Sequence, residues 1–135
     1  MMKILVAYAA TLFVIIALDM LWLGVLAKEI YAAAIGHLLA PRPGLIAAAL
    51  FYTLFSLGLV LFAVVPNAGS CGWSKSLTSA ALFGFFTYMT YDLTNLATLR
   101  GWPVGHSVLD VAWGVLVSVC AAACGTMALR WFARQ

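Results

Sequence analysis

The sequence predicts an all-α integral membrane protein, a four-transmembrane-helix bundle with a short interfacial helix between spans 1 and 2. The chain is 66% hydrophobic and only 8% charged, and its mean hydropathy of +1.10 excludes an ordinary soluble domain. Four apolar runs each reach the roughly 20 residues that a helix needs to cross a bilayer. Because the connections are short, we expect one domain over residues 1–135 and no soluble part.

The first expected span is Ile4–Ala27. It is longer than the roughly 7–15 apolar residues of a secretory signal and contains Asp19 and Trp22, so we expect it to be retained. The segment Lys28–Ala40 is too short to span and carries Lys, Glu and His. It predicts an interfacial helix that lies on the membrane surface or folds over the mouth of the bundle.

The other expected spans are Gly44–Val65, Ser76–Leu99 and Ser107–Leu129, separated by connections that contain Pro or Gly. The third span includes the polar stretch Thr87–Asn95 (TYMTYDLTN). Because hydroxyl groups surround this part of the helix, we expect the third span to be central. We expect the second span, with fewer polar residues, to be the most exposed to lipid.

Small residues at four-residue spacing predict where the last two spans touch, because they let helix backbones approach closely. They form one ridge on each span: Ser76, Ala80 and Gly84, continued by Tyr88 and Asp92, and Asp110, Gly114, Ser118 and Ala122.

The distribution of basic residues predicts the orientation. Four spans put both termini on one side, together with Lys3, Lys75, Arg130 and Arg134, whereas Lys28, Arg42 and Arg100 lie on the other side. The positive-inside rule then favours cytoplasmic termini. The small net positive charge reflects this topology, and no feature indicates a nucleic-acid partner.

Three of the four acidic residues lie inside the expected spans. At about 1.5 Å per residue, Asp19 lies ~12 Å, Asp92 ~11 Å and Asp110 ~5 Å from the same, non-cytoplasmic face, and Tyr52 reaches a similar level. No Lys or Arg stands at mid-span to neutralise them. Carboxylates in lipid must face protein, water or a bound cation, so this convergence indicates one polar pocket.

We expect neighbouring side chains one helical turn away to complete the pocket. Trp22, Trp113 and Asn95 each follow an aspartate at i+3 and can donate a hydrogen bond to it. Trp22 fits the interfacial aromatic belt equally well, and Trp73, Trp102 and Trp131 are expected in that belt. The expected ligand-binding residues are Asp19, Asp92, Asp110, Asn95, Tyr52, Tyr88, Tyr91, Trp22 and Trp113.

The residues limit the chemistry of this pocket. A hard divalent metal, if any binds, would use Asp19, Asp92 and Asp110. The three cysteines (Cys71, Cys120 and Cys124) form no C-x-x-C pair and are expected to be reduced, and the two histidines (His37 and His106) lie near the ends of spans, which disfavours haem. The cofactor stays open, and we expect no catalytic residues.

Five segments resemble the small bacterial membrane family known as domain of unknown function 2177. They are LDMLWLG (18–24), Tyr31 with GHLL (36–39), Phe51-Tyr52 with FAVVP (62–66), YDLTNLATLRGWP (91–103) and DVAWG (110–114). The resemblance covers almost the whole chain and implies a four-span inner-membrane protein. It implies no activity, substrate or cofactor.

Three functions are therefore open. The first is binding or passage of a small cation, a proton or a polar ligand. The second is a lipid-modifying enzyme or its accessory membrane subunit, and the third is a structural bundle in which neutral aspartates join the helices. We favour the first, with the lipid bilayer as the partner and a homo-oligomer as a further possibility.

Overall fold

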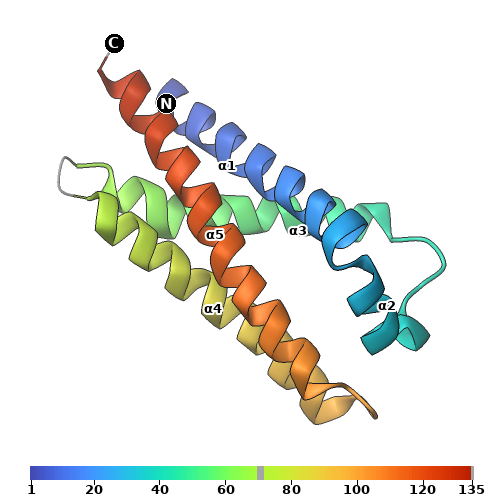
Figure 1. The fold of residues 1–135 in the computed structure, drawn as a ribbon. Helices are drawn as coiled ribbons and strands as arrows, with labels where there is room; N and C mark the ends of the chain where they lie inside the picture. Colours follow the sequence, from blue (N-terminus) through green and yellow to red (C-terminus); the bar gives the residue numbers. More distant parts are fainter. Residues whose placement is uncertain (70–71, 135) are drawn as a thin grey trace.

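The computed structural model describes residues 1–69 and 72–134, which form helices and loops without a strand, so the predicted all-α class is confirmed (Figure 1). The main helices are α1 (Met2–Leu21), α2 (Lys28–Ile35), α3 (Leu45–Leu59), α4 (Trp73–Thr98) and α5 (Val104–Ala133). A π-helical turn, Trp22–Leu26, continues α1. Another, Val60–Val64, continues α3 and leads into the 3-10 turn Val65–Asn67.

Three helical segments are long and apolar enough to cross a membrane: Met2–Leu26, Leu45–Asn67 and Val104–Ala133. They correspond to the first, second and fourth expected spans. α4 is 26 residues long, or about 39 Å at 1.5 Å per residue, but its polar residues keep it outside this group. The protein is therefore a membrane protein with several apolar helices.

α5, not α4, is the centre of the fold. Thirteen residues of α5 are buried, compared with four of α4, and α5 packs along both α1 and α4 (Figure 1). The expectation of a central third span is wrong because most threonines of α4 satisfy their own hydroxyl groups. Thr90, Thr94 and Thr98 each donate to a backbone carbonyl one turn earlier, at 2.6–2.7 Å, and are exposed.

The predicted small-residue ridges are confirmed as the contact between α4 and α5. Ser76, Ala80, Gly84 and Asp92 are the buried residues of α4. A Cβ atom on Gly84 would lie 2.4 Å from the carbonyl oxygen of Gly114. Only a glycine fits there, because the two helix backbones are in direct contact.

The second span is not the most exposed one. In the most apolar 18-residue window of each segment, 22% of residues are buried in Met2–Leu26 and 33% in Leu45–Asn67. The reason is the π-helical turn Val60–Val64, where Val60, Ala63 and Val64 are buried against α4 and α5.

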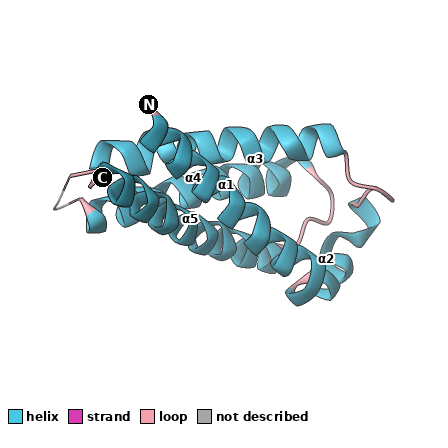
Figure 2. Ribbon diagram, turned by 90° about the horizontal axis from the view of Figure 1, so that it is seen from above, coloured by secondary structure: helices cyan, strands magenta, loops and turns pink. Residues whose placement is uncertain are grey.

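The segment after the first span does form a short helix, although α2 and the 3-10 turn Gly36–Leu38 end before the expected Ala40. α2 lies at the end of the molecule opposite both termini (Figure 1). Figure 2 shows α2 between the end of α1 and the start of α3. Its Tyr31 and Ile35 turn inward and line a cavity.

α3 and α4 meet at one end and diverge towards the other. The π-helical turn Val60–Val64 packs on α4, and the Phe55 and Phe83 rings meet with centroids 5.2 Å apart. Beyond this contact the first half of α3 leans away from α4 (Figure 1). The resulting wedge, closed at its far end by α2, contains the cavity described next.

Candidate functional site

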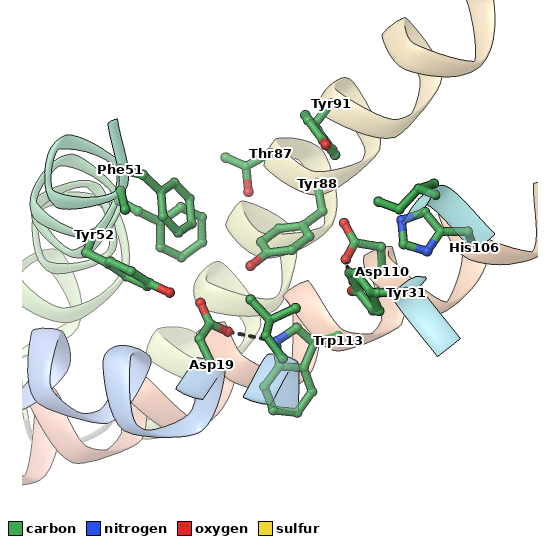
Figure 3. Close-up of a pocket in the computed structure, with 14 residues that line it drawn as sticks. Asp19, Tyr31, Phe51, Tyr52, Thr87, Tyr88, Tyr91, His106, Asp110 and Trp113 are labelled. Atoms are coloured by element: carbon green, nitrogen blue, oxygen red, sulfur yellow. Dashed lines mark hydrogen bonds between the residues drawn. The ribbon is translucent and has the colours of Figure 1, made fainter. Parts of the chain in front are cut away.

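A half-open cavity of about 570 Å³ lies between the helices at the end of the molecule opposite the termini (Figure 3). This volume is within the range of small-molecule sites, roughly 300–1,000 Å³. All five main helices contribute to it. The lining residues are Asp19, Leu23, Tyr31, Ile35, Ala48, Phe51, Tyr52, Phe55, Thr87, Tyr88, Tyr91, His106, Asp110 and Trp113.

Asp19 forms one side of the cavity. It is 3% exposed and lies in the last turn of α1, just before the π-helical turn. The indole N–H of Trp113 donates to Asp19 Oδ1 at 2.8 Å, and the hydroxyl of Tyr52 points towards the other carboxylate oxygen (Figure 3). The carboxylate is thus held by neutral groups from α5 and α3.

A chain of aromatic contacts leads from Asp19 to the second carboxylate. The Trp113 ring stacks on Trp22 with centroids 4.4 Å apart and an interplanar angle of 4°. The Trp22 indole donates to the Tyr31 hydroxyl at 3.3 Å, and Tyr31 in turn donates to Asp110. One connected network therefore joins α1, α2 and α5.

Tyr31 is the residue through which α2 enters this network. Burial, followed by the hydrogen bond to Asp110, raises the pKa of Tyr31 above its ordinary value. The phenol therefore stays protonated at neutral pH and remains a donor to Asp110. Its ring also meets His106 edge to face, with centroids 4.6 Å apart.

His106 lines the cavity near Asp110, and Trp102 packs against His106 with ring centroids 5.4 Å apart. His106 is 5% exposed and Trp102 is 7% exposed, so Trp102 does not belong to the interfacial belt where we expected it. Its indole is satisfied inside the protein by Ser107 Oγ at 2.9 Å. His106 Nδ1 is buried and has no hydrogen-bond partner among residues 1–69 and 72–134.

Asp92 does not line the cavity. It is 0% exposed and adjoins Asp110, Ser107 and Trp102. Neither carboxylate oxygen of Asp92 has a hydrogen bond of normal geometry within the described part of the chain. Buried carboxyl groups without a partner are rare, and each calls for a physical reason.

Tyr88 occupies the middle of the cavity wall because Gly114 has no side chain. A Cβ atom on Gly114 would lie 2.2 Å from the Tyr88 ring. The Tyr88 ring lies between Asp19 and Asp110 (Figure 3). The ridge that joins α4 to α5 thereby also positions a site residue.

The structure brings most of the expected site residues together. Asp19, Asp110, Tyr52, Tyr88, Tyr91 and Trp113 line the cavity, whereas Trp22, Asp92 and Asn95 do not. Trp22 supports the lining by stacking on Trp113. The sequence analysis did not include two lining residues with ionisable side chains, Tyr31 and His106, among the site residues. His106 could have been found, because it precedes Asp110 by one helical turn and therefore lies on the same face of the helix.

The expected aspartate–tryptophan pairs within one helix are wrong. Trp113 donates to Asp19 and not to Asp110, and Trp22 donates to Tyr31. Side chains at i and i+3 project in the same direction from their helix. They therefore reach the neighbouring helix together, and each finds its partner there.

The three aspartates do not converge into one metal site. Within the described residues, no group of three or more His, Cys, Asp or Glu side chains could hold a metal ion. Cys120 and Cys124 are free, as expected, and Cys71 lies outside the described residues.

Comparison with known proteins gives the family. No curated protein and no solved structure matches the chain. The family model described as "Predicted membrane protein (DUF2177)" matches residues 4–127, nearly the whole sequence. The chain therefore belongs to this family of predicted membrane proteins, as the resemblance of its motifs suggested.

Proposed function

We propose that this protein is a four-span protein of the bacterial inner membrane whose cavity binds a small cation, a proton or a polar ligand within the bilayer. The observation that carries the proposal is the convergence of side chains from five helices on one cavity with two buried carboxylates. Ionisable groups at such a depth are expensive unless they serve a site.

The course of the chain supports α4 as the fourth span. α3 ends near the termini, whereas α5 starts at the opposite end of the molecule (Figure 1). α4 joins these two points in a single helix of 26 residues. If α3 and α5 span the bilayer, α4 must cross it too, and its threonines can face lipid because their hydroxyls are satisfied internally.

The charge distribution supports an orientation with both termini, which lie at the same end (Figure 1), in the cytoplasm. Lys3, Lys75, Arg130 and Arg134 belong to that end and Lys28, Arg42 and Arg100 to the other, and the positive-inside rule favours the more basic end as the cytoplasmic one. A reporter fused after Gln135 is expected to be active in the cytoplasm. Periplasmic activity in a folded fusion would invert the orientation, and the cavity would then face the cytoplasm.

A lipid-modifying enzyme is the weaker alternative. The cavity lining contains no Lys or Arg that would bind a lipid phosphate. A purely structural bundle is also disfavoured, because neutral aspartates that only join helices would fill the space between them. Here they border a cavity of about 570 Å³.

Filling the cavity tests the proposal. Ala48 lines the cavity from α3, whereas the next residue, Ala49, is exposed and does not. We would measure the unfolding midpoint of wild type, Ala48→Trp and Ala49→Trp in detergent with a series of small ammonium, carboxylate and neutral polar compounds and across pH. At least one class, or protons, is expected to stabilise the wild type by mass action.

The Ala49→Trp control should keep that response, and Ala48→Trp should lose it while it stays folded. Equal responses in all three proteins, or no response to any class or to pH, would contradict a binding function.

A further inference from the structure

We infer that the ligand of this cavity is an organic cation: an ammonium group attached to an apolar body, which reaches the cavity sideways between α3 and α4. This inference rests on the proposed function and specifies the chemical class of its ligand.

The first argument is charge. Two carboxyl groups, Asp19 and Asp110, border the cavity, and no Lys or Arg lines it. The donors that reach these two acids are neutral indole and phenol groups. When these acids are ionised, a cationic ligand compensates their charge in a medium of low dielectric constant, and an anionic ligand would be repelled.

The second argument is the wall between the acids. Seven of the fourteen lining residues are Phe, Tyr or Trp, and the Tyr88 ring lies between Asp19 and Asp110 (Figure 3). Aromatic faces attract ammonium groups and cannot coordinate a hard metal ion. Among the described residues, no group of three or more His, Cys, Asp or Glu side chains could hold a metal ion, and the aromatic lining is of the kind that binds organic ammonium groups.

The third argument is the path of access. α3 and α4 approach each other at the π-helical turn Val60–Val64 and diverge beyond it (Figure 1). At the open side stand Phe51 of α3 and Tyr91 of α4, which are 41% and 52% exposed. In a bilayer this side faces lipid, so an apolar body can lie between the two helices while its charged end reaches the acids.

Two sources supply this chemistry, a free amphipathic cation and the ammonium headgroup of a lipid such as phosphatidylethanolamine. Both would place the positive group beside Asp110 and Tyr88. The absence of Lys and Arg from the lining means that the phosphate of a lipid would have to stay outside the cavity.

The test uses the full chain in lipid nanodiscs and benzyltrimethylammonium as the probe. Its uncharged carbon analogue, neopentylbenzene, has the same shape, and benzenesulfonate carries the opposite charge. We expect the cation alone to raise the unfolding midpoint of the wild type. Asp110→Asn should weaken its apparent Kd at least roughly tenfold, since a desolvated charge contact is lost.

Tyr88 gives a second, graded readout. Tyr88→Phe keeps the ring and should bind nearly as well as the wild type, whereas Tyr88→Leu should bind about three- to thirtyfold more weakly, the range for a cation–π contact. Thr98→Val, at an exposed position outside the cavity, should bind as the wild type does.

Nanodisc composition then separates the two sources. Weaker binding of the probe in phosphatidylethanolamine discs than in discs of an uncharged galactolipid, which has no ammonium group and no net charge to concentrate the probe, would identify a lipid headgroup as the competitor. Equal binding would indicate a free cation. If the neutral or the anionic analogue stabilises the protein as well as the cation does, the inference is wrong although the cavity still binds ligands. If Ala48→Trp keeps every response of the wild type to these compounds and to pH, the proposed function itself is wrong.

Discussion

The two ends of this helical bundle solve the problem of polar groups in a membrane differently. Near the termini, hydroxyl groups are paired and buried: Ser76 bonds Thr126 at 2.8 Å and Thr11 bonds the carbonyl of Ala7 at 2.8 Å. At the other end, the carboxyl groups of Asp19 and Asp110 border a cavity. Asp92 and His106 there keep buried atoms without a partner among the described residues, as Arg130 Nε does near the C-terminus.

Packing follows the same division. A Cβ atom on Gly125, near the termini, would lie 2.3 Å from Thr11 Oγ1, so α1 and α5 touch directly there. At the cavity end, α3 and α4 separate, and aromatic side chains fill only part of the space between them (Figure 3). One end of the molecule is therefore closely packed, and the other contains the cavity in which we propose that a ligand binds.

The largest effect is expected at the α4–α5 contact. Gly84→Ala should lower stability by roughly 1–3 kcal/mol or more, because the new methyl group would overlap the backbone of α5. Gly105→Ala, in the first turn of α5 with nothing near its would-be Cβ, is the matched control and should be neutral or stabilising. Unfolding midpoints in detergent measure both, and a tolerated Gly84→Ala would mean that the helices are not in contact.

The second largest loss of stability is expected when the hydrogen bond from Trp113 to Asp19 is removed. Trp113→Phe keeps an aromatic ring against Trp22 but removes the indole N–H that bonds the carboxylate. A buried acceptor left without its donor costs about 1–3 kcal/mol. Trp131→Phe, at an exposed position, should change stability by less than about 0.5 kcal/mol. Equal losses in the two variants would show that the bond to Asp19 contributes nothing.

Two threonine variants compare the stability contributed by a buried hydroxyl pair near the termini with that of an exposed hydroxyl on α4. Thr126→Val leaves the buried Ser76 hydroxyl without its partner, and we expect a loss of about 1–3 kcal/mol. Thr94→Val removes a hydroxyl that bonds only its own helix and is exposed, so its effect should stay within about 0.5 kcal/mol. The reverse order of losses in denaturant titrations would contradict our assignment of the lipid-facing side of α4.

The smallest effect is expected for Asp92→Asn. Asparagine matches the size and hydrogen-bonding capacity of a neutral aspartic acid, and Asp92 has no hydrogen bond of normal geometry to lose among the described residues. Stability should change by less than about 1 kcal/mol, and binding of benzyltrimethylammonium should weaken less than in Asp110→Asn. A loss of several kcal/mol would instead identify Asp92 as an ionised group with a strong partner.

The sequence predicted the class of protein, most of its helices and the layer in which Asp19 and Asp110 line one cavity. Hydropathy and length located α1, α3 and α5, and the spacing of Ser76, Ala80 and Gly84 identified the buried ridge of α4. These are local properties, since burial in lipid and helix periodicity depend on residues close together in the chain. The acids Asp19 and Asp110 were placed in one layer from the rise of a helix alone.

Only the tertiary structure decided which groups meet. The sequence paired Asp19 and Asp110 each with the tryptophan on its own helix, but the bonds cross between helices, from Trp113 to Asp19 and from Tyr31 to Asp110. It also suggested that α4 is central, although α5 is. Residue spacing fixes the direction of a side chain around its own helix axis, whereas its partner depends on the angle at which another helix packs against it. For that reason the polar residues could be found from the sequence, and the cavity between α3 and α4 could not.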